Sequence, residues 1–172
     1  MPATTIHELE LRSLTPALTY ALGSRLAAAA RPGDVLCLWG ELGAGKTVFA
    51  KGFGAGLAVT TTVSSPSFIL MAEHDGRLPL FHLDLYRLAT AEEALAGGLL
   101  DGRQAHGVAL IEWPDRLGAA LPAERLDVEI DGAGEDVRSI RLRAASETYR
   151  RYLDAAPEPG VAPGAAPGSV TG

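Results

Sequence analysis

Residues 40–47 read Gly-Glu-Leu-Gly-Ala-Gly-Lys-Thr and decide the fold, because this stretch fits the G-x-x-x-x-G-K-[ST] pattern of a phosphate-binding P-loop. The apolar run 35–39 before the loop predicts a buried strand, and residues 48–53 after the loop predict a helix. The glycines let backbone N–H groups curl around a phosphate at the N-terminus of that helix. Lys46 would reach the β- and γ-phosphates, and the hydroxyl of Thr47 would ligate Mg²⁺. The stretch therefore predicts a nucleotide-binding site.

The bulk composition is that of an ordinary soluble domain. The chain has 172 residues, of which 47% are hydrophobic and 21% are charged. No apolar run approaches the length of a membrane span, and the N-terminus lacks a basic region followed by an apolar one. The one cysteine, Cys37, has no partner for an internal disulfide and is typical of a reducing compartment. We therefore expect a cytoplasmic protein with no membrane contact.

The charged residues also carry information. Lys46 and Lys51 are the only lysines, against thirteen arginines. A chain that otherwise uses arginine has kept lysine where the P-loop needs a compact ammonium group. The net charge of −6 argues against a broad electrostatic surface for nucleic acid.

The remaining segments predict an α/β fold, a P-loop NTPase-like mixed β-sheet flanked by helices. Alternation at residues 7–11 indicates a short edge strand, and a Thr-Pro cap precedes an amphipathic helix over residues 16–30. Segments 126–130 and 137–142 alternate cleanly and predict a C-terminal β-hairpin.

The end of the chain changes in composition. A brief helix at residues 146–153 is expected to close a single domain that spans residues 1–153. From residue 154 to residue 172, 13 of the 19 residues are Ala, Pro or Gly. Because such a segment cannot bury a core, residues 154–172 are predicted to form a disordered tail.

Two acidic residues stand at the ends of predicted strands. The apolar run 80–83 leads to Asp84, and the run 108–111 leads to Glu112. An apolar strand that ends in a carboxylate is the Walker B pattern, which places an anion near Mg²⁺ and the attacking water. Either carboxylate could hold the metal or orient the water. For His82, which shares the face of Asp84, the pattern favours a packing role over a catalytic one.

Two further features allow more than one interpretation. Residues 60–68 are rich in hydroxyl groups and lie one element after the P-loop, where a segment that senses the γ-phosphate is usually found. The pattern alone favours an ordinary Ser/Thr loop over such a segment. Trp113 follows Glu112 directly and could stack on a base or a partner, although a half-buried core tryptophan is the more common case.

The order of these motifs resembles the TsaE (YjeE) family. The resemblance rests on Gly-x-Leu-Gly-Ala-Gly-Lys-Thr, then Val-x-Ser-Pro-x-Phe at 63–68, His-x-Asp-x-Tyr-Arg-Leu at 82–88 and Ile-Glu-Trp-Pro at 111–114. It extends over residues 15–153, and the combination is far more specific than the P-loop alone. One departure is Ser67, where the family usually has threonine. These proteins are bacterial P-loop ATPases needed for threonylcarbamoyladenosine (t6A) modification of tRNA.

The resemblance implies a mixed sheet with the P-loop at its centre, ATP and Mg²⁺ as cofactors, and ATP hydrolysis. It further implies work in complex with the proteins TsaB and TsaD, with tRNA met only indirectly through that complex. Residues 65–68 would form a switch-like segment, and Trp113 would lie beside the metal-site carboxylates. The adenine would lie near the start of the first helix.

The expected site residues fall into three groups. The catalytic residues are Lys46, Asp84 and Glu112. The metal ligands are Thr47, Asp84 and Glu112. The nucleotide contacts are Pro16, Leu18, Gly43, Ala44, Gly45, Lys46, Thr47 and Val48.

Two other P-loop classes fit the sequence less well than an ATPase. A small-molecule kinase needs a lid with several arginines and an acceptor pocket, and the candidate lid at residues 89–106 offers only Arg103. A GTPase normally recognises guanine with an Asn-Lys-x-Asp stretch, and no lysine follows Lys51 to supply one. The kinase is the main alternative.

Overall fold

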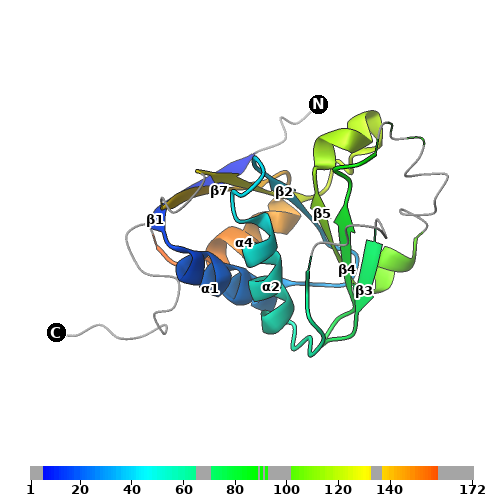
Figure 1. Cartoon of the computed structure of the whole chain (residues 1–172), viewed down its shortest axis with the longest axis horizontal. Helices are drawn as coiled ribbons and strands as arrows, with labels where there is room; N and C mark the ends of the chain where they lie inside the picture. The colour runs from blue at the N-terminus through cyan, green and yellow to red at the C-terminus, as the bar shows by residue number, and fades with distance from the viewer. Residues whose placement is uncertain are drawn as a thin grey trace.

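The computed structural model of the chain describes residues 6–64, 71–88, 90, 92, 102–132 and 137–158. A single seven-stranded sheet forms the centre of the molecule, in the order β1-β7-β6-β2-β5-β4-β3 (Figure 1). The strands are β1 (His7–Leu14), β2 (Val35–Trp39), β3 (Met71–His74), β4 (Leu80–Asp84), β5 (Val108–Glu112), β6 (Leu126–Asp131) and β7 (Arg138–Ala144). Strand β2, which leads into the P-loop, is the middle strand.

The sheet is mixed, which confirms the predicted fold class. Strands β6, β2, β5 and β4 run parallel, whereas β7 is antiparallel to β6 and to β1, and β3 is antiparallel to β4. The predicted hairpin of β6 and β7 is confirmed, and β1 is an edge strand as expected. In a mixed sheet of this kind the ends of the parallel strands meet at one edge, where ligand sites form.

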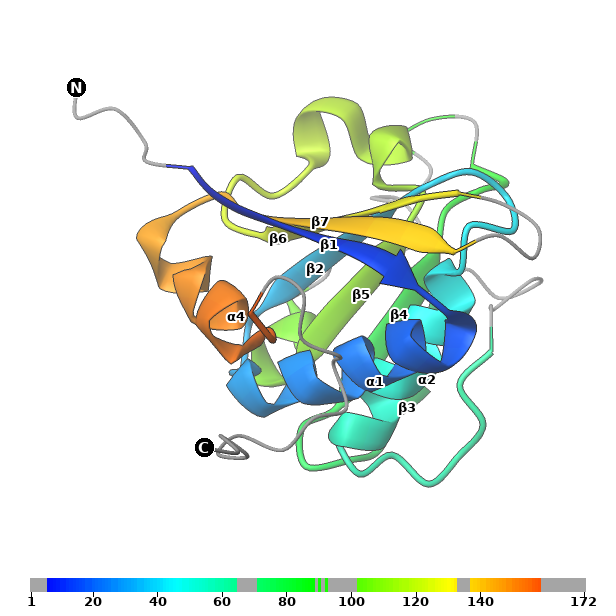
Figure 2. The same ribbon diagram turned by 90° about the vertical axis from the view of Figure 1, so that its left-hand side faces the viewer.

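Helices cover both faces of the sheet. Figure 2 shows α-helices of the described part of the chain lying together on one face. They are α1 (Pro16–Leu26), α2 (Lys46–Gly56) and α4 (Arg150–Ala155). The 3₁₀ helix Pro114–Ala120 covers the other face through Leu117. Side chains of β2 alternate between the two faces of the sheet. Leu36 and Leu38 belong to the hydrophobic core under the α-helices, and Cys37 belongs to the core on the opposite face.

Helices α1 and α2 lie side by side and approach so closely that glycine is required between them. A Cβ atom at Gly52 would lie 2.0 Å from the carbonyl oxygen of Tyr20, and one at Gly23 would lie 2.4 Å from that of Phe49. Both obstacles are backbone atoms, which cannot rotate away. The backbone contact therefore fixes the position of α2, whose first turn belongs to the P-loop.

A buried carboxylate fastens α4 to the start of β2. Asp34 accepts hydrogen bonds through Oδ2 from the Tyr152 hydroxyl (2.5 Å), from the backbone N–H of Arg31 (2.9 Å) and from the Arg151 guanidinium. Burial, followed by the hydrogen bond to Asp34, raises the pKa of Tyr152. Nearby, the hydroxyl of Tyr149 accepts a hydrogen bond from the N–H of Val35 (2.9 Å).

The boundaries of some predicted elements differ from those observed. Helix α4 continues to Ala155, and Ala156 is buried, so the structured part of the chain extends past residue 153. The N–H of Ala156 caps the helix, and the carbonyl of Ala155 accepts a hydrogen bond from Arg25 (2.7 Å). The candidate switch segment at 65–68 and the tail from residue 159 onward lie outside the described residues. Within the described ranges, no helix has both the length and the apolar character needed to cross a membrane.

Candidate functional site

The P-loop connects the middle strand to α2 through backbone conformations that favour glycine. Gly43 and Gly45 have φ angles of 77° and 109°, in the left-handed region where a Cβ atom is strained. Gly45 is also the N-cap of α2, and its carbonyl accepts the N–H of Phe49 (3.0 Å). The helix therefore begins at Lys46, with its positive N-terminal end at the loop.

A cleft of about 380 Å³ opens at the P-loop. It is lined by Leu42, Gly43, Gly45, Lys46, Thr47, Val48, Asp84, Glu112 and Trp113. These residues come from three places: the P-loop with the first turn of α2, the end of β4, and the end of β5. The register of the parallel strands pairs Asp84 with Glu112 directly, which is why the two carboxylates reach the same cleft. Its size is within the range of small-ligand sites.

The surroundings of Lys46 have opposing effects on its pKa. Its Nζ donates hydrogen bonds to the carbonyl oxygens of Gly40 (2.5 Å) and Glu41 (2.9 Å), and it lies 4.4 Å from the ring centroid of Trp113. Burial lowers the pKa of Lys46, and the nearby carboxylates of Glu112 and Asp84 oppose that shift. The ammonium group thus sits between the loop carbonyls and the two acidic residues.

Glu112 is buried and is held by a histidine. Nε2 of His82 lies 2.8 Å from Oε2 of Glu112, and neither side chain is more than 4% exposed. The sequence pattern favoured a packing role for His82. The structure shows it buried on β4, as packing requires, but also bonded to a candidate catalytic carboxylate across the β4–β5 pair. His82 therefore fixes the rotamer of Glu112.

Asp84 and Trp113 complete the wall of the cleft. Oδ1 of Asp84 accepts the backbone N–H of Tyr86 (3.1 Å), and the Tyr86 ring lies 4.9 Å from the Trp113 ring. Trp113 has φ 60° and ψ 51°, a left-handed conformation that is unusual for a bulky residue. Such strain is found most often at functional sites. Trp113 is therefore part of the cleft and is not a simple core residue.

The side chains at the cleft suit a hard cation that is shared with phosphates. Thr47, Asp84 and Glu112 all present oxygen donors there. Mg²⁺ usually takes one or two carboxylates together with substrate phosphates and water. Within the described residues, no cluster of three or more His, Cys, Asp or Glu side chains could hold a metal by itself. The donor set fits Mg²⁺ that arrives with a nucleotide.

Three of the expected nucleotide contacts do not line the cleft, namely Pro16, Leu18 and Ala44, and Ala44 is a buried residue of the P-loop itself. Pro16 is exposed at the start of α1, and Leu18 is half-buried against the helix-side core. Neither lines the P-loop cleft. They lie on the helix that packs against α2, and their expected role near the adenine stays a prediction.

Sequence reasoning missed Arg138, the first residue of β7. This buried side chain donates from Nε to the carbonyl of Ala44 (2.7 Å) and from Nη2 to that of Gly43 (3.1 Å). The alternation of the strand could have indicated it, because Arg138 lies two and four residues before Ile140 and Leu142 and so faces the same side of the sheet as these buried residues. An arginine at an inward position needs a buried acceptor.

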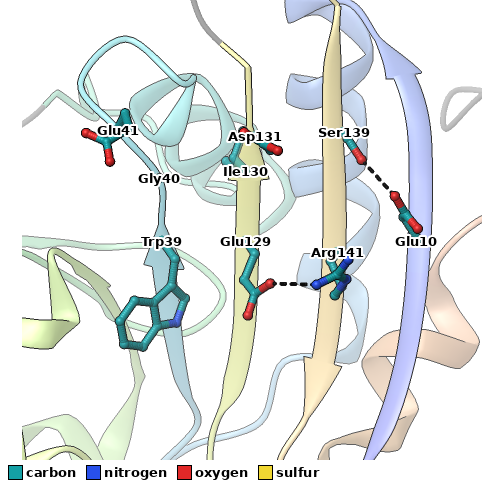
Figure 3. Close-up of a pocket in the computed structure, with 9 residues that line it drawn as sticks. All are labelled: Glu10, Trp39, Gly40, Glu41, Glu129, Ile130, Asp131, Ser139 and Arg141. Carbon is teal, nitrogen blue, oxygen red and sulfur yellow. Dashed lines mark hydrogen bonds and ion pairs between the residues drawn. The ribbon is translucent and has the colours of Figure 1, made fainter.

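A second hollow, of about 410 Å³, adjoins the P-loop and the ends of the strands beside it (Figure 3). Glu10, Glu41, Glu129 and Asp131 give it a largely acidic wall, on which Arg141 pairs with Glu129 (3.5 Å). Four carboxylates would repel a phosphate. The acidic hollow is therefore less suited to a phosphate than the P-loop cleft, which contains Lys46.

Comparison with known proteins agrees with these features. A family model described as "Threonylcarbamoyl adenosine biosynthesis protein TsaE" matches residues 14–140. The chain is 45% identical over 148 residues to the tRNA threonylcarbamoyladenosine biosynthesis protein TsaE of Bacillus subtilis, covering 86% of this chain and 92% of that protein. The protein of the same name from Streptomyces coelicolor is 37% identical over 136 residues, with 74% and 91% covered.

A solved structure is also similar. The crystal structure of Bacillus subtilis YdiB matches with a TM-score of 0.74 and 39% sequence identity, over 88% of this chain and 95% of that chain. The family model spans the P-loop, both strand-end carboxylates and Arg138. The chain therefore belongs to the TsaE family of threonylcarbamoyl adenosine biosynthesis proteins.

Proposed function

We propose that this protein is an ATPase that binds ATP with Mg²⁺ in the P-loop cleft and supports t6A modification of tRNA in complex with TsaB and TsaD. The observation that carries the proposal is the register of β4 and β5. It places Asp84 beside Glu112 at the cleft that holds Lys46 and Thr47. The names of the relatives support the pathway.

Each residue has a role that follows from its chemistry. The N–H groups at the start of α2 would bind the phosphates, and Lys46 would exchange the carbonyls of Gly40 and Glu41 for phosphate oxygens. Thr47 and one carboxylate would hold Mg²⁺, which neutralises charge that develops on the phosphates. The other carboxylate would orient the attacking water. Glu112 is the better placed for that task, because His82 already fixes its orientation.

The protein is proposed to act through partners and to turn over slowly alone. The net charge of −6 disfavours tRNA binding by this chain by itself. Trp113 lines the cleft and the exposed Tyr86 packs against its ring, so a partner docked there would contact both rings and the nucleotide together. TsaB and TsaD are expected to cover this side and to change the rate of hydrolysis.

The test compares two lysines on one helix. Lys46→Ala should abolish measurable ATP binding and hydrolysis, whereas Lys51→Ala, on the exposed side of α2, should leave both unchanged. Turnover of wild type is then measured with and without the TsaB–TsaD pair, and tRNA affinity is measured alongside. Fast turnover that does not change when TsaB and TsaD are added, or transfer of phosphate to a small acceptor, would instead favour a small-molecule kinase.

A further inference from the structure

The buried guanidinium of Arg138 donates hydrogen bonds to the backbone of the P-loop. Arg138 is 6% exposed, and its fork reaches the carbonyl oxygens of two consecutive loop residues, Ala44 at 2.7 Å and Gly43 at 3.1 Å. A guanidinium is planar and presents its donors as a rigid fork. Neither Arg138 nor Ala44 lines the P-loop cleft.

Holding a carbonyl also orients the N–H group of the next residue. In a planar trans peptide the C=O and N–H bonds point in opposite directions. When Arg138 fixes the carbonyl of Ala44, the N–H of Gly45 is directed away from the guanidinium, and Gly45 lines the cleft. In the preceding peptide, the N–H of Ala44 donates to the carbonyl of Glu41 (3.1 Å). Two adjacent peptide planes are thereby set by hydrogen bonds.

This anchoring matters because the loop is intrinsically permissive. Gly43 and Gly45 have positive φ angles and no Cβ contacts within 4 Å, so their own sterics do not select one conformation. The start of the loop is held differently, since a Cβ atom at Gly40 would lie 2.6 Å from the carbonyl oxygen of Ile130 on β6. The β6–β7 hairpin thus contacts the loop at its start through β6 and in its middle through Arg138.

We infer that Arg138 is a positioning residue that presets the P-loop peptides for phosphate. The inference rests on the proposed function, because it concerns how the same cleft binds its nucleotide. Lysine cannot replace the fork, since one ammonium lacks the planar geometry that reaches two carbonyls at once. Arg138→Lys keeps the buried charge and so separates the effect of geometry from the effect of charge.

The experiment measures the dissociation constants of ATP and ADP for wild type, Arg138→Lys, Arg138→Met and the control Arg143→Lys. Arg143 lies on the same strand but pairs with Glu8 on β1. We expect Arg138→Lys to weaken both nucleotides at least about tenfold at a temperature where circular dichroism shows it folded. Arg138→Met should weaken them further, and Arg143→Lys should match wild type. If Arg138→Met does not fold, the lysine variant decides.

The possible outcomes distinguish the inference from the proposal beneath it. A lower melting temperature for Arg138→Lys with unchanged affinity would mean that Arg138 only stabilises the fold, and the inference would be overturned. Wild type that fails to bind ATP would overturn the proposed function as well. Weaker binding in both Arg138→Lys and Arg143→Lys would also count against a specific role for Arg138.

Discussion

At the scale of single residues, the cleft uses two carboxylates in different surroundings. Glu112 is buried and bonded to His82, whereas Asp84 is half-buried and bonded to the backbone of Tyr86. A buried carboxylate with a fixed rotamer is suited to orienting a water, and a more accessible one to a metal that exchanges with its nucleotide. Both are expected to be needed for turnover.

Replacing either carboxylate by its amide should therefore slow the reaction strongly without unfolding the protein. Asp84→Asn and Glu112→Gln are each expected to lower the ATP turnover rate by more than roughly tenfold, because the amide can neither balance a metal charge nor accept a proton. Steady-state phosphate release measures this. Glu41→Gln is the matched control, an exposed acid on the P-loop. Full turnover in either cleft variant would make that residue a structural strand end.

His74 gives the protein a pH-dependent stability. Burial, and secondarily the nearby His82, lowers the pKa of His74 below its ordinary value of 6.5. The folded state therefore favours the neutral ring, while the unfolded state takes up a proton at higher pH. The stabilisation is present above about pH 6.5 and is lost as the pH falls toward the folded-state pKa. The melting temperature should fall between pH 7 and pH 5.

The matched measurement uses His74→Gln, whose amide can still bond to the hydroxyl of Thr61, which lies 2.8 Å from Nδ1 in wild type. The variant should show a shallower decline over the same pH range. Equal slopes for wild type and His74→Gln would assign the decline to other groups.

The residues of the site differ in how far the sequence could predict them. The P-loop side chains, Asp84 and Glu112 were recognisable because their chemistry depends on local order, a glycine loop before a helix and an acid at the end of a strand. Arg138 was not found, because its acceptors lie on a loop more than ninety residues away in the chain. The hydrogen bond of His82 likewise depends on the register of β4 with β5, which no local pattern shows.

At the scale of elements, the contact between α1 and α2 determines where the P-loop helix lies. Because Gly52 meets the backbone of Tyr20, Gly52→Ala should force the helices apart. We expect a loss of about 1–3 kcal/mol in the free energy of unfolding, which exceeds the gain in helix propensity from alanine. Thermal unfolding measures it as a drop of several degrees.

Gly54→Ala is the control for this prediction. It lies on the same helix, gains the same propensity and meets mainly the methyl group of Val63 (2.8 Å), a side-chain atom that can shift. Its effect on stability should be smaller. Equal losses in the two variants would show that helix separation is not the cause.

Most helices and strands could be predicted from the sequence, whereas the order of the strands in the sheet could not. Alternation and a Thr-Pro cap predicted β1, α1 and the β6–β7 hairpin, and an apolar run beside the P-loop motif predicted β2 and α2, since each depends on residues close in sequence. The 3₁₀ helix Pro114–Ala120 was missed, because it contains a kink at Gly118 and has no amphipathic period. The central place of β2 came from the family resemblance. Strand order is set by long-range pairing that periodicity does not encode.

At the scale of the whole molecule, the last described residues decide where the chain can be shortened. Deleting residues 159–172 should leave the melting temperature and ATP turnover nearly unchanged, because that composition offers little to bury. Deleting residues 154–172 removes Ala155 and the buried Ala156 and should lower the melting temperature by several degrees. Differential scanning calorimetry of both truncations tests this. A large effect of the shorter deletion would show that residues 159–172 dock on the domain.

The pairing of β1 with β7 affects how the nascent chain folds during translation. Strand β1 ends at Leu14 and β7 begins at Arg138, so at ordinary rates of synthesis the first strand waits on the order of ten seconds for its partner. Helices α1 and α2 can meet well before that, but the Arg138 contact with the P-loop cannot. Ribosome-stalled chains that end before β7 should therefore leave β1 open to protease, and the P-loop cleft should reach its final form only after β7 has emerged from the ribosome.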